Sequence, residues 1–90
     1  MIPLHGFLEG DTLGLLVLAR EEDTAASLAR LLQDAAALRV APLENPCVWV
    51  RGEPLDPSST VAAAGLQPLD RFDVRNTARV DTAPAERVRR

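Results

Sequence analysis

The chain is poor in the residues that cross-link small proteins or hold metals, with one cysteine and one histidine among 90 residues. A single cysteine, Cys47, cannot form an internal disulfide, which favours a reducing compartment. The start of the chain has no basic segment followed by an apolar core, and no apolar run approaches the roughly 20 residues that cross a bilayer. We therefore expect a cytoplasmic protein that makes no contact with membranes.

The side-chain groupings that carry catalysis are also missing. Metal centres need several converging His and carboxylate ligands, and no Glu-x-x-His pair accompanies His5. Cys47 has no basic neighbour in the sequence to activate its thiol. No Gly-x-Ser-x-Gly elbow surrounds a serine, and the five glycines form no phosphate-binding loop. We expect no catalytic residue, no metal, no cofactor and no small-molecule substrate; His5 is predicted at a subunit contact or bonded to backbone, and Cys47 is predicted to be inert.

Charge is low and evenly spread. The net charge is −3 at pH 7, and the arginines of residues 87–90 are offset by Asp81 and Glu86. No aromatic residue that could stack on bases lies near them. This pattern argues against nucleic acid and against an anionic membrane surface as partners.

Two short apolar runs flank residues 9–12, Glu-Gly-Asp-Thr, which is a hairpin pattern. We predict that Leu4 pairs with Val17 and Leu8 with Leu13. Because side chains alternate between the faces of a strand, this register assigns every apolar residue of the hairpin to a face. The core face then holds Ile2, Leu4, Leu8, Leu15 and Val17, and the outer face holds His5, Phe7, Leu16 and Leu18.

Residues 25–38 have the spacing of an amphipathic helix, with either Asp23 or Thr24 as its N-cap. The residues expected to face the core are Ala25, Leu28, Leu31, Leu32 and Ala35.

The second half of the chain predicts a strand, a short strand, one helical turn and a closing strand. Residues 48–50 are strong strand formers ended by Gly52, and Trp49 is expected to face outward because its two valine neighbours make the better core pair. A short strand and one helical turn, residues 61–64, follow before a closing strand with one buried and one wet face. The order predicts an α+β domain in which one helix packs on a mixed four- to five-stranded sheet.

Residues 1–75 are expected to form this one domain, and residues 76–90 a flexible charged tail. No glycine follows Gly65 in this sequence. Covalent modifiers and sulfur carriers of related fold react through a Gly-Gly terminus, so we expect this chain to be neither.

The residues resemble ubiquitin remotely, through the Asp23-Thr24 helix start, Gly52, and residues 60–66, and this implies a ubiquitin-like β-grasp fold. A closer resemblance covers nearly the whole chain up to residue 76. It is to the small gamma (B) subunit of bacterial multicomponent diiron monooxygenases, the group that contains toluene-4-monooxygenase system protein B. It rests on several segments taken together: Pro3-Leu4-His5, the turn at 9–11, Arg39-Val40-Ala41-Pro42, residues 48–51, Leu55-Asp56-Pro57, residues 60–66 and Phe72-Asp73-Val74.

The resemblance implies a non-catalytic structural subunit that docks on the large catalytic subunit of a diiron hydroxylase acting on aromatic or alkene hydrocarbons. The large and medium hydroxylase subunits would be its partners, and the diiron centre would lie in the large one. The alternative is a free-standing bacterial ubiquitin-like adaptor without C-terminal Gly-Gly chemistry.

The outer sheet face and the loop after the helix are the expected partner interface. Leaving large apolar side chains exposed there would create a patch of the size that usually marks a partner surface. The alternative is that the tail folds over this face. The predicted interface residues are His5, Phe7, Leu16, Leu18, Trp49, Arg39 and Pro42.

Overall fold

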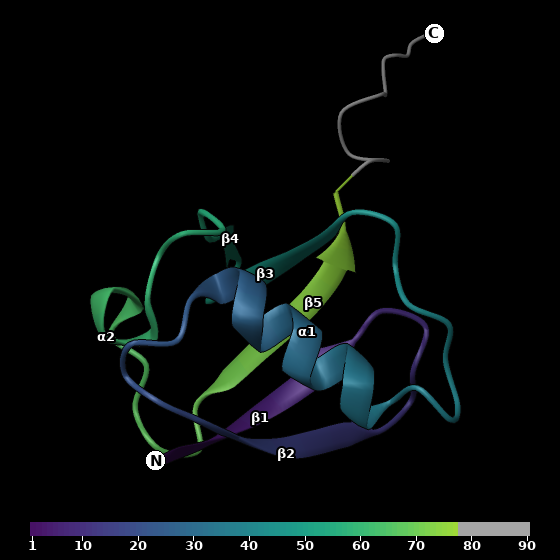
Figure 1. The fold of residues 1–90 in the computed structure, drawn as a ribbon, viewed down its shortest axis with the longest axis horizontal. Helices are drawn as coiled ribbons and strands as arrows, with labels where there is room; N and C mark the ends of the chain where they lie inside the picture. The colour runs from purple at the N-terminus through teal and green to yellow at the C-terminus, as the bar shows by residue number, and fades with distance from the viewer. Residues whose placement is uncertain (78–90) are drawn as a thin grey trace, which may run out of the picture.

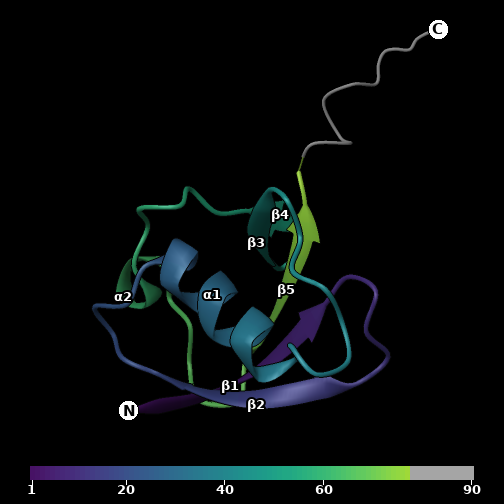
Figure 2. The same ribbon diagram turned by 45° about the vertical axis from the view of Figure 1, so that its right-hand side comes forward.

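The computed structural model describes residues 1–77, which form a five-stranded mixed sheet with one long helix across it (Figure 1). The elements are β1 (Ile2–Leu8), β2 (Gly14–Ala19), α1 (Ala25–Ala35), β3 (Pro46–Val50), β4 (Glu53–Pro54), α2 (Val61–Ala64) and β5 (Arg71–Asn76). The strand order is β2-β1-β5-β3-β4. Figure 2 shows α1 packed against one face of the sheet, and no helix of residues 1–77 on the opposite face. The predicted α+β architecture is confirmed.

The hairpin of β1 and β2 has the register that the apolar pattern predicts. Leu4 lies opposite Val17, and the ladder runs from Ile2 opposite Ala19 to Phe7 opposite Gly14. The expected Leu8–Leu13 pair falls outside the ladder, because the turn occupies more residues than expected. In that turn Gly10 has a φ of 92°, and the Asp11 N–H donates to the Leu8 carbonyl over 2.9 Å.

Helix α1 begins as predicted and ends earlier. The Thr24 hydroxyl accepts from the Ser27 N–H at 3.2 Å, which satisfies one of the unpaired amides of the first turn. The helix ends at Ala35, three residues before the predicted end at 38.

The buried stripe of α1 is centred differently from the prediction. Leu31 and Ala35, which were expected in the core, are exposed, while Ala29 and Ala36 are buried. Alanines carry little bulk, so the helix can approach the sheet closely along the side that carries them. The helix therefore packs on the sheet through the side that carries Leu28 and Ala29, and Leu31 lies away from the sheet.

The core lies between α1 and the sheet. Its largest fully buried side chains are Leu4, Leu28, Leu32, Val48, Val61, Phe72 and Val74. Helix α2 closes one end of the core: the Thr60 hydroxyl accepts from the Ala63 N–H, and Gly65 ends the helix with a φ of 72°. No helix among residues 1–77 is long and apolar enough to cross a membrane.

Strand β5 extends to Asn76, the residue at which the tail was predicted to begin. The Asn76 side chain accepts from the Asn45 N–H, and the Asn76 N–H donates to the Glu9 carboxylate. The rest of the predicted tail, residues 78–90, lies outside the described residues.

Candidate docking face of the sheet

The face of the sheet away from α1, called here the outer face, is formed by every second residue of the strands. Along β5 the buried Phe72 and Val74 alternate with Arg71, Asp73 and Arg75. Along β1 and β2 the same alternation turns His5, Phe7, Leu16 and Leu18 outward. The structure therefore brings four of the predicted interface residues together on neighbouring strands.

Leu16 and Leu18 are the most exposed large apolar side chains of the outer face, at 58% and 57% of their full area. They lie on β2, which is the edge strand of the sheet. His5 is exposed and lies opposite Leu16 in the ladder. Edge strands are usually guarded by charge, proline or a covering segment, and Gly14–Ala19 contains no charged residue and no proline. This edge is apolar, and no further strand of residues 1–77 pairs with it.

Phe7 lies beside these leucines but is half-buried. The guanidinium carbon of Arg71 is 4.0 Å from the centre of its ring. The ring also lies across Gly14, where an added Cβ would come within 2.6 Å of it. Phe7 is thus covered on the solvent side by an arginine and supported on its other side by a glycine.

Trp49 is on the outer face, but it is separated from the leucines. Strand β5 lies between β1 and β3, and strands are spaced by about 4.8 Å, so the Trp49 backbone is about 10 Å from that of Phe7. Trp49 is half-buried, with the guanidinium carbon of Arg75 5.2 Å from its ring centre. The expectation of one continuous exposed patch of Phe7, Leu16, Leu18 and Trp49 is therefore wrong.

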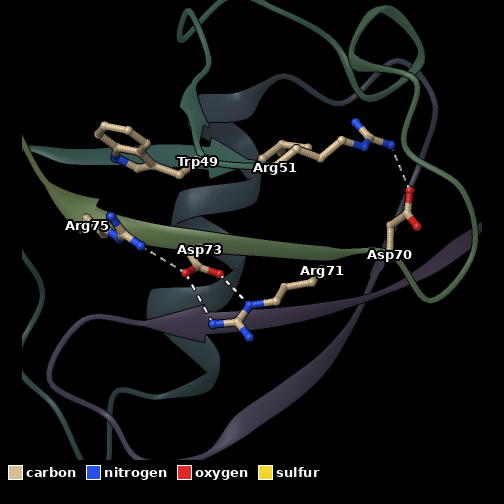
Figure 3. Close-up of a pocket in the computed structure, with 8 residues that line it drawn as sticks. Trp49, Arg51, Asp70, Arg71, Asp73 and Arg75 are labelled. Atoms are coloured by element: carbon tan, nitrogen blue, oxygen red, sulfur yellow. Dashed lines mark hydrogen bonds and ion pairs between the residues drawn. The ribbon is translucent and has the colours of Figure 1, made fainter.

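A charged row on β5 lies between the strands that carry Phe7 and Trp49. Figure 3 shows this row of Arg71, Asp73 and Arg75 beside Trp49. The Asp73 carboxylate accepts from Arg71 Nε at 2.8 Å and from Arg71 Nη2 at 3.3 Å. The same carboxylate also accepts a hydrogen bond from Arg75 Nη2 at 3.4 Å. The hydrogen bond to Asp73 raises the pKa of Arg71 above its ordinary value. The sequence predicted that these side chains face water, but not that two of them cover the aromatic rings.

A hollow of about 340 Å³ lies at the end of this row, beside the β3–β4 turn. It is bordered by Trp49, by Arg51 and Asp70, and by the three β5 side chains. Arg51 Nη2 is 3.4 Å from Asp70 Oδ2 (Figure 3). Sequence reasoning missed Arg51, Asp70, Arg71 and Arg75 as site residues, because no motif links the β3–β4 turn to β5.

The loop after α1, which supplies Arg39 and Pro42 to the predicted interface, lies beside the β1–β2 turn (Figure 1). Pro42 is exposed. The Arg39 side chain forms an ion pair with Asp11, with 2.6 Å between Nη2 and Oδ2. The hydrogen bond from Arg39 is the main cause that lowers the pKa of Asp11. Arg39 thus joins two loops of this chain, and its contact with a partner stays a prediction.

The described residues form neither a metal-binding cluster nor an activated Cys47 thiol. Within residues 1–77 no three metal-ligating side chains converge. Cys47 is half-buried, and its thiol lies 3.9 Å from the Leu55 carbonyl. Burial raises the pKa of this thiol, which disfavours the reactive thiolate.

Comparison with solved structures gives close relatives of this fold. A chain of a toluene 4-monooxygenase HD complex with the inhibitor 4-bromobenzoate is 30% identical with a TM-score of 0.75, and the match covers 81% of this chain and 94% of that one. Ubiquitin of Caldiarchaeum subterraneum is 15% identical with a TM-score of 0.66, covering 81% and 89%. ATBAG1, from a complex with HSP70, is 8% identical with a TM-score of 0.69, covering 84% of this chain and 40% of that one. The last two show that the fold is ubiquitin-like.

Comparison with curated protein sequences gives no significant match. Comparison with protein families gives one match, described as toluene-4-monooxygenase system protein B (TmoB), which covers residues 1–76 and thus all the strands and helices described above. The chain belongs to the toluene-4-monooxygenase system protein B family.

Proposed function

We propose that this chain is a non-catalytic structural subunit of a multicomponent diiron hydroxylase that oxidises aromatic or alkene hydrocarbons. The observation that carries the proposal is the family match over residues 1–76, supported by the 30% identity to a chain of a toluene 4-monooxygenase complex. The large and medium hydroxylase subunits are its proposed partners, in the cytoplasm.

The diiron centre implied by the family does not fit the residues of this chain. Carboxylate-bridged diiron sites use a glutamate from each of two helices and a Glu-x-x-His motif from each of two others. Here the only histidine, His5, lies on a strand, and α1 carries no glutamate. We therefore place the diiron centre in the large subunit and assign this chain to assembly.

The proposed contact is the apolar edge of the outer face. Leu16 and Leu18 are exposed on an edge strand that carries no charge to discourage pairing or packing. Burying apolar area contributes about 25 cal/mol per Å², and only the surplus over the cost of association appears as affinity. Two exposed leucines, with His5 and the half-buried Phe7 beside them, give such a contact its apolar centre.

Co-expression with the large and medium subunits tests the proposal. We expect the wild-type chain to co-purify with them and Leu16→Asp to be lost from the complex while it remains folded, because Leu16 contributes little to the core. Leu31→Asp is the matched control, since Leu31 is exposed on α1 and lies outside both the proposed contact and the loop that carries Arg39 and Pro42. A wild-type chain that stays monomeric and separate from both subunits would contradict the proposal and favour the free-standing adaptor.

A further inference from the structure

The buried indole N–H of Trp49 points to an acceptor that the chain itself does not supply. Trp49 Nε1 is shielded from solvent and has no hydrogen-bond partner among the described residues. A buried donor without an acceptor is costly, and each case in a native protein calls for an explanation. Trp49 borders the hollow at the β3–β4 turn, and the Arg75 guanidinium lies over its ring. Because Nε1 itself is closed to solvent, an acceptor that enters the hollow reaches it only when Arg75 moves.

The charges around the hollow fit an anionic acceptor. Arg51, Arg71 and Arg75 border it together with only two carboxylates, which leaves one positive charge in excess. Asp73 is used mainly by Arg71, which approaches both of its oxygens. Arg75 reaches Asp73 only at 3.4 Å and makes no other side-chain hydrogen bond that the structure describes, although a guanidinium has five N–H donors. Most of its donors are therefore open to a second carboxylate.

The backbone conformation of Arg51 is an independent observation in favour of a binding site at the hollow. Its φ is 53° and that of Gly52 is 82°, the positive values that a type I′ hairpin turn needs at both central positions. Asparagine, aspartate or glycine fits the first of these positions best, and a long side chain there carries backbone strain. The arginine is nevertheless held there, with its guanidinium over the hollow and only a 3.4 Å contact to Asp70.

We infer that the hollow receives a carboxylate side chain from the large hydroxylase subunit, which accepts from Trp49 Nε1 and from the Arg75 guanidinium. The inference rests on the proposed function and adds a second, polar contact to the apolar one at Leu16 and Leu18. In the unbound chain the guanidinium carbon of Arg75 is 5.2 Å from the centre of the indole ring. On binding, the Arg75 side chain moves off the ring and donates hydrogen bonds to the incoming carboxylate. Arg51 supplies attraction from the turn.

The test measures binding of the purified chain to the co-expressed large and medium subunits. We expect Arg75→Glu to weaken binding by about tenfold or more, because it places a like charge against the carboxylate. Trp49→Phe keeps an aromatic ring and removes the N–H, and it should weaken binding by about threefold or more, the effect of one lost hydrogen bond. Arg30→Glu, on α1 and hence on the opposite side of the sheet, makes the same change in charge and should leave binding unchanged.

Fluorine NMR of the chain labelled with 5-fluorotryptophan gives a direct readout, since Trp49 is its only tryptophan. Binding of the two subunits should shift this signal in the wild type, and thermal unfolding of each variant checks that it is folded. If Arg75→Glu and Trp49→Phe bind like the wild type while Leu16→Asp does not bind, the carboxylate site is wrong and the proposed function stands. A signal shifted by sodium succinate and unmoved by the subunits would overturn the protein partner in favour of a small dicarboxylate. A wild-type chain that does not bind the subunits at all would instead contradict the proposed function.

Discussion

Arg39 and Asp11 form an ion pair that joins the loop after α1 to the turn between β1 and β2, with 2.6 Å between Nη2 and Oδ2. A second contact, Arg39 Nε to Oδ1 at 3.4 Å, makes the pair two-pronged. The Asp11 carboxylate also accepts from the Leu13 N–H at 3.3 Å. The pair thus orders two loops that are 28 residues apart in the chain.

This ion pair predicts a stability difference that depends on pH. Arg39, and then the Leu13 N–H, lower the pKa of Asp11 below its ordinary 3.8. A carboxylate whose pKa is lowered by folding stabilises the fold above its unfolded pKa, and this contribution disappears as the pH falls through the lowered value. We expect Arg39→Gln to be less stable than the wild type at about pH 7, and the difference to be smaller at about pH 3, below the ordinary pKa of 3.8. Urea unfolding at the two pH values measures this.

Arg30→Gln is the control for that comparison, because Arg30 is exposed on α1 and makes no ion pair with a described residue. It should unfold like the wild type at both pH values. A stability loss in Arg39→Gln that is equally large at low pH would show that Arg39 acts through packing and that its charge is unimportant.

Two glycines on the hairpin predict opposite consequences of the same substitution. At Gly6 a Cβ would lie 2.8 Å from Phe72 Cζ and 2.9 Å from Leu32 Cδ1, inside the core. Overpacking a core costs roughly 1–3 kcal/mol, so Gly6→Ala should lower the free energy of unfolding by that amount. At Gly14 the Cβ would meet the Phe7 ring at 2.6 Å, but this ring lies on the outer face and can swing toward solvent. Gly14→Ala should therefore cost less than about 1 kcal/mol.

Denaturant unfolding of both alanine variants measures the difference. Gly14→Ala should also break the contact between Phe7 and Arg71, and a changed environment of the Phe7 ring by NMR would show it. Equal losses of stability in the two variants would mean that the outer-face ring is packed as tightly as the core.

Most of the fold could be predicted because local patterns and the global architecture agree. Gly10, Gly52 and Gly65 mark turns with positive φ, and the alternation of apolar residues puts Leu16 and Leu18 outward. The candidate site could be predicted only in part, because strand order is not a local property. The sequence placed Trp49 on the correct face but could not show that β5 lies between it and Phe7.

Contacts between side chains that are far apart in the sequence could not be predicted for the same reason. Arg71 and Arg75 alternate with buried residues, which predicts exposure, but their stacking on Phe7 and Trp49 depends on which strands flank β5. The buried stripe of α1 was predicted correctly at Ala25, Leu28 and Leu32. It was wrong at Leu31 and Ala35, because helical spacing alone does not show that the helix packs on the sheet along the side that carries Ala29.

Leu69 predicts a stabilising substitution. It follows Pro68 in a tight turn and has a φ of 69°, a conformation that favours glycine and costs a side-chain-bearing residue about 1–2 kcal/mol. Its side chain is 59% exposed, so little packing would be lost. Its N–H donates to the Pro3 carbonyl over 2.6 Å, and glycine keeps that donor. Leu69→Gly should raise the free energy of unfolding by about 1 kcal/mol, after the extra entropy of an unfolded glycine is subtracted.

Leu69→Ala separates strain relief from loss of the exposed leucine. Alanine retains the Cβ that conflicts with positive φ, so this variant should gain no stability. Thermal or urea unfolding of the two variants together decides the matter, and a gain in Leu69→Ala equal to that in Leu69→Gly would show that backbone strain is not the cause.

Cys47 predicts slow thiol chemistry in the folded chain. Burial is the main cause that raises its pKa above the ordinary 9.0, and it outweighs an opposing backbone hydrogen bond from Leu55. Only the thiolate reacts with alkylating agents, so a raised pKa lowers the reactive fraction near neutral pH. We expect iodoacetamide at about pH 8 to alkylate Cys47 several-fold more slowly in the native chain than in urea, where its pKa returns to the ordinary value. The native rate should keep rising with pH after the rate for the urea-unfolded chain has levelled off. Equal alkylation rates in the native and unfolded chains would contradict this prediction. They would mean that the contact between Cys47 and Leu55 opens readily and that the thiol is exposed for most of the time.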